Sequence, residues 1–431
     1  MQKLEDEELL KLIGDQTDER VFAVFAALKR GISPEKIHEI SKIDLYFLNE
    51  MNTLADFEKR LAKVGLSKAL YYEGKSFAYS DRALLALSGS DELPCAPLKP
   101  VYKMVDTCAG EYEAATPYFY ALHPSPESPS EKEALRFTSK SSKPTVVVLG
   151  SGPIRIGQGI EFDYASVHCV RSLQRMGYEV VTINNNPETV STDYDSSDRL
   201  YFEPLTEESV LNILEEENPL GVIVSFGGNT AINLTAAISE AGYTILGSSE
   251  RSIDMAEDRE AFEALLTRLN IERPKGYTVR NTEQALEAAN ALGYPILLRP
   301  SYVLGGQNMI IAHDDADVRE YMAIILEQNP DNIILIDKYL MGREVEVDGI
   351  FDGEDLLLPG IMEHVERAGV HSGDSIAVYP ALNVSEAMRR EIFSTTRRLC
   401  MGLDARGIVN LQYIISGEKL YVIEVNPRAS R

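Results

Sequence analysis

Apolar residues recur at helical spacing from the start of the chain to about residue 120. In the segment 17–31, one predicted helix has a face made of Val21, Val24, Phe25 and Leu28. Positions i, i+3, i+4 and i+7 share one side of a helix, so we expect this face to be buried. Thr17 or Asp18 can cap the start of the helix, and Gly31 can end it. The pattern predicts an all-α domain over residues 1–122.

The pattern changes after a polar segment. Residues 123–144 are rich in proline, serine and charge, which predicts a linker. Short apolar runs separated by helical stretches then follow, as in a parallel sheet with helices on both faces. These runs are residues 145–150, 179–186, 221–228 and 243–247. They predict an α/β domain over residues 145–255.

Longer runs that alternate apolar and polar residues fill the rest of the chain, residues 256–431, and such alternation is typical of antiparallel hairpins. We expect hairpins around residues 305–306, at residues 352–353 and over residues 409–428, with helices between them. The whole chain is therefore predicted to be a multidomain protein of the α/β and α+β classes that begins with a helical domain.

Length and composition agree with this organisation. A chain of 431 residues can form two or three domains, and 44% hydrophobic residues is ordinary for a globular protein. No apolar run approaches the roughly 20 residues that span a bilayer. The formal net charge of −25 argues against general nucleic-acid binding, because such binding requires clustered Lys and Arg.

The start of the chain and its cysteines predict a cytoplasmic location. The first residues are acidic and amphipathic, whereas a signal peptide has a basic region followed by an apolar run. The cysteines show no spacing typical of a metal site or a disulfide framework, which fits reduced thiols. They are Cys95, Cys108, Cys169 and Cys400.

A glycine-rich turn follows the first apolar run of the α/β domain. Its glycines are Gly150, Gly152, Gly157 and Gly159. Such glycines allow backbone N–H groups to approach an anion at a helix N-terminus. The spacing differs from that of a dinucleotide-binding turn, and the next run ends in residues 184–186, all asparagine, where a ribose-binding acid would be expected. We favour a turn that packs domains together and keep dinucleotide binding as the alternative.

Arg299 precedes the predicted hairpin at Gly305 and Gly306. A glycine-rich tip can close over phosphates as a lid, while the arginine supplies positive charge and paired hydrogen bonds. An ordinary glycine hairpin is an equal alternative on this pattern alone.

Glu344, Glu346 and Asp348 alternate with valines, so the three acids share one face of a strand. Such a stripe is usually the solvated side of a sheet. The alternative is a nucleotide site in which one carboxylate accepts the ribose hydroxyls.

Gln412, Glu424 and Asn426 form the strongest candidate site. Glu424 and Asn426 share one strand face, and Gln412 lies on the hairpin partner. Carboxylate and amide oxygens are hard ligands that suit magnesium. Direct opposition of Gln412 and Glu424 is expected to require an odd-length turn, for example residues 417–419. The alternative is an exposed polar sheet edge.

Arg428 and Arg431 follow this strand, where they could neutralise charge on a transferring phosphoryl group. His371 is a further candidate, although a lone histidine is more often structural or a solvated loop residue.

The chain resembles the large subunit of carbamoyl phosphate synthetase. The motifs GSGPIRIGQGIEFDYA, NNNPETVSTDYDSSDR, AEDRE, RPSYVLGG, EHVERAGVHSGDS and IEVNPRASR carry the resemblance through most of residues 145–431. It implies a helical oligomerisation domain, a Rossmann-like pre-ATP-grasp domain and an ATP-grasp domain that stops before its C-terminal end. Their position implies the half of the subunit that phosphorylates carbamate.

The resemblance also implies a set of ligand-binding residues. Those expected to contact ATP are Arg259, Arg299, Lys338, Leu340, Glu344, Gly369, Val370, His371, Ser372, Gln412 and Glu424. Gln412, Glu424 and Asn426 would hold two magnesium or manganese ions, and Arg299, Arg428 and Arg431 would act in catalysis. Two departures are that Lys338 stands where the family commonly has a histidine, and that the stretch from Leu340 to Glu344 is one residue short.

The implied reaction is ATP-dependent phosphorylation of carbamate, in the synthesis of carbamoyl phosphate for arginine and pyrimidine biosynthesis. The implied partners are a glutaminase small subunit, the bicarbonate-phosphorylating half and further copies of the chain. The rival hypotheses are another ATP-grasp carboxylate ligase, a nicotinamide-binding oxidoreductase, and an inactive fragment that serves assembly alone.

Overall fold

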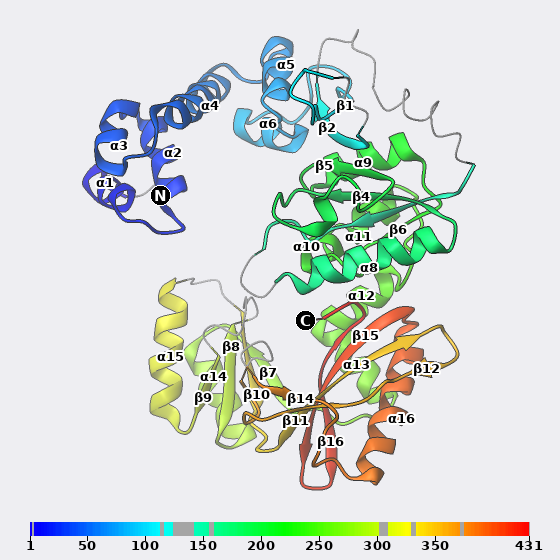
Figure 1. Ribbon diagram of the computed structural model, residues 1–431. Helices are drawn as coiled ribbons and strands as arrows, with labels where there is room; N and C mark the ends of the chain where they lie inside the picture. Colours follow the sequence, from blue (N-terminus) through cyan, green and yellow to red (C-terminus); the bar gives the residue numbers. More distant parts are fainter. Residues whose placement is uncertain are drawn as a thin grey trace. The chain divides into compact units, whose positions relative to one another are not determined.

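The protein is described by a computed structural model, drawn as a ribbon in Figure 1. The structure describes residues 1, 4–112, 116–123, 142–154, 159–300, 309–328, 333–370 and 375–430. The chain divides into two compact units. One consists of Met1–Lys103 and Tyr120–Ala134, and the other of Met104–Phe119 and Leu135–Arg431. Among the described helices, none is both long and apolar enough to cross a membrane.

The first unit is built from helices, which form the blue part of the ribbon in Figure 1. They are α1 (Asp6–Gly14), α2 (Arg20–Arg30), α3 (Pro34–Ser41), α4 (Leu45–Val64), α5 (Lys68–Ser76) and α6 (Asp81–Ser88). Buried side chains such as Leu9, Val24 and Leu48 form one cluster, and a second cluster surrounds Phe57 and Tyr71. The predicted helical character of this unit is confirmed.

The predicted start of α2 is wrong, whereas its predicted buried face is confirmed for Val24 and Leu28 and wrong for Val21. Its N-cap is Glu19, which makes no side-chain capping bond, because residues 17–20 form a turn before the helix. Val21 is 53% exposed, and the small side chains of Ala23 and Ala27 face the core instead. Gly31 ends the helix as predicted, in the left-handed conformation at φ 89°.

Two short strands lie near the end of the region 1–122, so the prediction that this region is entirely α-helical is wrong there. They are β1 (Val101–Met104) and β2 (Tyr118–Leu122), in a stretch of the sequence where the two units meet. β1 contains Val and Tyr, and β2 contains Tyr and Phe, and these residue types favour strands over helices.

The second unit contains a parallel sheet in its first part. Strands β2, β5, β4, β3 and β6 lie in this order. The elements of this part are β3 (Thr145–Leu149), α8 (Glu161–Arg175), β4 (Glu179–Asn184), the 3-10 helix η1 (Val190–Thr192), β5 (Arg199–Phe202), α9 (Glu207–Glu217), β6 (Gly221–Ile223), α10 (Gly228–Ile232), α11 (Thr235–Glu240) and α12 (Glu250–Glu257). The predicted run at residues 243–247 forms only an isolated bridge from Ile245 to Val222. The α/β class of this part is confirmed.

Both faces of this sheet are covered. Val146 and Val180 pack with α8 on one face, while Val147 and Val181 of the opposite face are also buried. An ion pair, Arg199 with Glu217, is buried beside the sheet.

The last part of the second unit contains two antiparallel sheets. Its elements are α13 (Arg259–Arg268), β7 (Gly276–Val279), α14 (Thr282–Leu292), β8 (Ile296–Pro300), β9 (Ile310–Ala312), α15 (Asp315–Gln328), β10 (Ile334–Lys338), β11 (Arg343–Phe351), β12 (Leu356–Leu357), β13 (Met362–His364), β14 (Ala377–Val378), α16 (Glu386–Leu403), β15 (Gly407–Ser416) and β16 (Lys419–Asn426). One sheet has the order β7-β10-β8-β9, and α14 and α15 pack on it. The other has the order β14-β13-β11-β15-β16, with β12 beside β11. The α+β class is confirmed.

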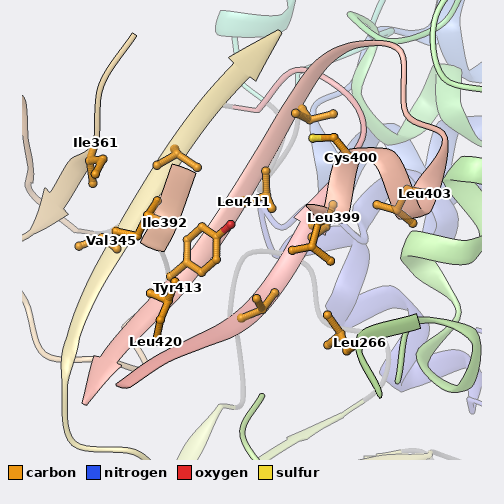
Figure 2. Close-up of a cluster of buried hydrophobic side chains, with 14 of the residues drawn as sticks. Leu266, Val345, Ile361, Ile392, Leu399, Cys400, Leu403, Leu411, Tyr413 and Leu420 are labelled. Carbon is orange, nitrogen blue, oxygen red and sulfur yellow. The ribbon is translucent and has the colours of Figure 1, made fainter. Parts of the chain in front are cut away.

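The larger of these sheets has one apolar face. Val345, Leu411 and Tyr413 from its strands pack against Leu399 and other residues of α16 (Figure 2). Because side chains alternate along each strand, the residues between them lie on the opposite face. That opposite face carries the polar residues of the candidate site.

Candidate active site

Two rows of polar side chains cross this opposite face of the larger sheet. The cross-strand register defines them as Glu346–Gln412–Glu424 and Asp348–Asn410–Asn426. Each row joins one residue from β11, one from β15 and one from β16. The predicted approach of Gln412, Glu424 and Asn426 is therefore confirmed.

The predicted odd-length turn is wrong. Ser416 pairs with Lys419, so the hairpin turns through two residues, Gly417 and Glu418. The register shifts by one residue beyond the Tyr413–Val422 pair, where Ile423 is the extra residue of a β-bulge. A bulge adds one residue to one strand and thereby changes which side chains face the partner. The bulge, and not the turn, brings Glu424 opposite Gln412.

Asn410 connects the two rows. Its fully buried amide donates hydrogen bonds to Glu346 Oε1 at 2.6 Å and to Asp348 Oδ1 at 2.9 Å. Asn426 in turn donates to Glu424 Oε1 at 2.7 Å. These bonds fix the side chains of both rows relative to one another.

The acidic stripe on β11 is not solvated, contrary to the interpretation that we favoured. Glu344 is 5% exposed and Glu346 is 4% exposed, because other segments of the protein cover this face. Burial raises the pKa of Glu344 above its ordinary value, and it raises the pKa of Asp348 as well. The stripe is an internal surface of the molecule.

His364 lies between two of these carboxylates. Its Nε2 atom is 3.3 Å from Glu346 Oε2, and its Nδ1 atom is 3.8 Å from Glu344 Oε1. The hydrogen bond to Glu346 raises the pKa of His364. The backbone N–H of Gly369 also donates to Glu344 Oε2, at 3.4 Å.

A cavity of about 680 Å³ lies between the smaller antiparallel sheet and the segments that precede β11 and follow β13. Leu297 and Ile311 line it from the smaller sheet, and Gly369 and Val370 line it from a segment after β13. Because Gly369 also contacts Glu344, the cavity adjoins the acidic stripe. Its size and mixed lining suit a small-molecule ligand.

Asp337, at the end of β10, holds two arginines together. Arg259 Nη2 lies 2.9 Å from Asp337 Oδ1, and Arg299 Nη2 lies 3.3 Å from Oδ2. Arg259 Nη1 and Arg299 Nε are buried donor atoms without a hydrogen-bond partner in the described structure. Donors left in this way can bind an anion such as a phosphate group.

Arg428 follows β16. Burial lowers the pKa of Arg428, while the negative charges of Glu424 and Glu257 act in the opposite direction. Its guanidinium donates to the Ala429 carbonyl at 3.1 Å. The charges of Arg428 and Glu424 therefore interact.

The side-chain ammonium group of Lys338 forms hydrogen bonds with backbone carbonyl groups. Its Nζ atom donates to the carbonyls of Gly293 and Tyr294, at 2.7 and 3.0 Å. Leu340 is half-buried, and its neighbours Tyr339 and Met341 both line the cavity.

Several predicted features lie outside the described residues. They are the lid glycines Gly305 and Gly306, the turn residue Gly157, and His371, Ser372 and Arg431. In the part of the turn that is described, a side chain at Gly150 would collide with Asn184. This close approach agrees with a packing role for that glycine.

The donor set on β15 and β16 fits a magnesium or manganese ion. Glu424 is exposed and forms no ion pair among the described residues, so its carboxylate can take a cation. Gln412 and Asn426 would add amide oxygens, which are hard ligands that Mg²⁺ accepts. Within the described ranges, no group of three or more His, Cys, Asp or Glu residues could hold a metal. A site here depends on one carboxylate and two amides, with places left for phosphate oxygens.

The sequence did not predict Asp337, His364 or Asn410 as site residues. Asn410 precedes Gln412 by two positions, so period-two spacing along the strand could have identified it. Asp337 is an acid at the end of an apolar run, which is a weaker signal. Nothing near His364 in the sequence indicated its two carboxylate neighbours.

Three family models match successive parts of the chain. The carbamoyl-phosphate synthetase large chain oligomerisation domain matches residues 1–99, the carbamoyl phosphate synthase preATP-grasp domain matches residues 142–255, and the carbamoyl-phosphate synthase L chain ATP binding domain matches residues 258–431.

Two curated relatives are similar over almost the whole chain. The carbamoyl phosphate synthase large chain of Lachnoclostridium phytofermentans is 51% identical over 431 residues, which are 98% of this chain and 39% of the relative. That of Clostridium botulinum is 50% identical over 439 aligned positions, covering 99% of this chain and 40% of the relative. The chain thus spans about two fifths of the length of these relatives.

Solved structures show a similar fold. A biotin carboxylase from Campylobacter jejuni has a TM-score of 0.53 at 16% identity and covers 68% of this chain and 67% of its own. The biotin carboxylase domain of a 2-oxoglutarate carboxylase from Hydrogenobacter thermophilus has a TM-score of 0.54 at 17% identity, covering 66% and 64%. At such identities the likeness concerns the fold alone.

Proposed function

Because this chain belongs to the carbamoyl phosphate synthase large-chain family, we propose that it phosphorylates carbamate with ATP and a divalent metal ion. The observation that carries the proposal is the pair of polar rows that join Gln412, Glu424 and Asn426, on the same sheet face as Glu344 beside the cavity. The proposed domains are helical oligomerisation over residues 1–122, a linker over 123–144, pre-ATP-grasp over 145–255 and ATP-grasp over 256–431.

In the proposed reaction, an oxygen of carbamate attacks the γ-phosphorus of ATP. The bond from that phosphorus to the β,γ-bridging oxygen breaks, ADP leaves, and the product is carbamoyl phosphate. Little covalent chemistry falls to the protein in such a phosphoryl transfer, so its residues act by positioning and charge neutralisation.

The proposed roles follow from where the residues lie. Arg259 and Arg299 would bind phosphate oxygens through donors that have no partner in the described structure. Glu344 would accept the ribose hydroxyls at the edge of the cavity, next to Gly369 and Val370. A metal ion held by the Gln412 set would neutralise charge on the phosphates.

The remaining predicted residues keep their proposed roles. Lys338, Leu340, His371 and Ser372 would contact ATP, and Arg428 and Arg431 would act on the transferred phosphoryl group. We further propose a glutaminase small subunit and a bicarbonate-phosphorylating half as partners, self-association through the helical domain, a cytoplasmic location, and a place in arginine and pyrimidine synthesis.

The test is the reverse reaction, Mg²⁺-dependent formation of ATP from ADP and carbamoyl phosphate, measured by luciferase luminescence. Changing Glu424→Gln removes the one carboxylate of the donor set, so we expect ATP formation to fall at least about 100-fold. The matched control is Glu418→Gln, in the exposed turn of the same hairpin, which should keep the parent rate.

Nucleotide binding without ATP formation in the parent chain would favour the assembly-only hypothesis. ATP-dependent phosphorylation of bicarbonate instead of carbamate would favour another carboxylate ligase of this fold. Binding of a nicotinamide dinucleotide without ATP would favour the oxidoreductase.

A further inference from the structure

His364 is a polar side chain in a buried position, which hydrophobic packing alone does not explain. Its side chain is 1% exposed, and the carboxylates of Glu344 and Glu346, each with a side chain 6% exposed, flank it. Two buried carboxylates on one strand face repel each other and lose solvation. A group that can carry positive charge between them offsets both effects.

The two ring nitrogens are not equivalent. Nε2 lies 3.3 Å from Glu346 Oε2, within hydrogen-bond distance. Nδ1 is a buried atom without a hydrogen-bond partner in the described structure, and it lies 3.8 Å from Glu344 Oε1. That separation is too long for a hydrogen bond, but it is close enough for a strong charge interaction in a buried site. Glu346 therefore anchors the ring, and the free nitrogen faces Glu344.

Glu344 is held on its other side as well. Its Oε2 atom accepts a hydrogen bond from Gly369 N–H at 3.4 Å, and Gly369 lines the cavity. Burial alone would favour the protonated form of Glu344, which is a poorer acceptor than a carboxylate. A positive charge on the adjacent imidazole opposes that protonation.

We infer that His364 is a positioning residue for nucleotide recognition, because its ring lies between Glu346 and Glu344 and holds the Glu344 carboxylate toward the ribose hydroxyls of ATP. This inference rests on the proposed function, since it assigns a partner to the carboxylate that would bind the ribose. His364 itself does not touch the nucleotide. Glu346 and Asn410 complete the support, because Asn410 holds Glu346 at 2.6 Å.

The inference predicts an effect that depends on the ribose hydroxyls. We would measure the affinities of Mg²⁺-ATP and Mg²⁺-2′,3′-dideoxy-ATP for the parent and for His364→Ala by titration calorimetry. Loss of a hydrogen bond to a charged acceptor should weaken ATP about tenfold in the variant. Dideoxy-ATP, which has no hydroxyls to offer Glu344, should change by less than about twofold.

A cycle with Glu344 separates a positioning role from a structural one. Once Glu344→Gln has removed the carboxylate, adding His364→Ala should not reduce the preference for ATP further. If the alanine variant does not fold, His364→Gln serves in its place, because it keeps an amide in the same space. This variant should lose part of the preference for ATP over dideoxy-ATP. His168→Ala, an exposed histidine on α8, is the control and should keep the parent preference.

An equal loss for ATP and dideoxy-ATP in His364→Ala would overturn the inference, and so would no loss for either. Absence of Mg²⁺-ATP binding by the parent would instead overturn the proposed function together with it. Parent binding with an unaltered preference in the variant counts against His364 alone.

Discussion

Asp348 illustrates how single residues of the site respond to pH. Its carboxylate is half-buried on the polar face and accepts bonds from Asn410 and Ser430. Burial nevertheless raises the pKa of Asp348 in the folded protein. A carboxyl group whose pKa is raised by folding stabilises the protein at low pH, and this contribution is lost as the pH rises through that pKa.

We therefore expect Asp348→Asn to become more stable relative to the parent as the pH increases from about 4 to 7. The amide keeps an acceptor for Asn410 but cannot ionise. The free energy of unfolding, measured with urea in metal-free buffer at both pH values, tests this. The prediction would be contradicted if Asp348→Asn became less stable relative to the parent as the pH rises.

For single residues, the sequence predicts which side chains belong to the site better than it predicts which side chains contact one another. Strand periodicity places Glu424 and Asn426 on one face, whereas Gln412 joins them only through the bulge at Ile423, which the sequence did not predict. Asp337 could not be identified in the same way, because its partners Arg259 and Arg299 come from a helix and another strand. Such pairings arise only from the tertiary fold.

The hairpin of β15 and β16 shows a second scale, that of the element. Ile423 is the extra residue at which the register shifts, and Gln412 faces Glu424 on the far side of it. Deleting Ile423 would leave Tyr413 opposite Val422 and Gln412 opposite Glu424 in a regular ladder. Deleting Val425 would instead move Asn426 to the apolar face.

We expect the Ile423 deletion to keep Mg²⁺-ATP affinity within about tenfold of the parent, because every side chain of the donor set stays on its face. The Val425 deletion, its matched control, should lose Mg²⁺-dependent binding. Fluorescence titration with a nucleotide analogue measures both. Equal loss in the two variants would refute this account of the bulge.

Element types were largely predictable, whereas their surroundings were not. Alternation predicted the hairpins of the last domain, and apolar runs predicted β3, β4 and β6. The same alternation on β11 suggested a solvated stripe, although Glu344 and Glu346 are buried. Period two separates the faces of a strand, but it does not show whether water or protein covers the polar face.

The whole molecule consists of two units with separate hydrophobic cores. Leu9 and Phe57 belong to cores of the first unit, while Val146 and Leu411 belong to cores of the second. Within the second unit, the two parts are joined by backbone contacts such as Ala429 N–H to the Ser225 carbonyl at 2.9 Å. The candidate site lies entirely in this second unit.

Calorimetry should therefore show two unfolding transitions, of which Mg²⁺-ATP raises only one. A ligand at about 100 times its dissociation constant stabilises the unit that binds it by about 2.7 kcal/mol. Removing the metal with a chelator should abolish most of this shift. A nucleotide that moved both transitions equally would show that the units unfold together.

The exposed turn at Gly417 and Glu418 has a practical consequence. Since Glu418 points into solvent and Ile423 lies between this tip and Glu424, a change of the Glu418 side chain leaves the pairing of Gln412 with Glu424 unchanged. A fluorescent label or short peptide tag placed there would report on the hairpin from outside while the donor atoms stay in register. The loop is thus a natural attachment point for spectroscopy of metal loading.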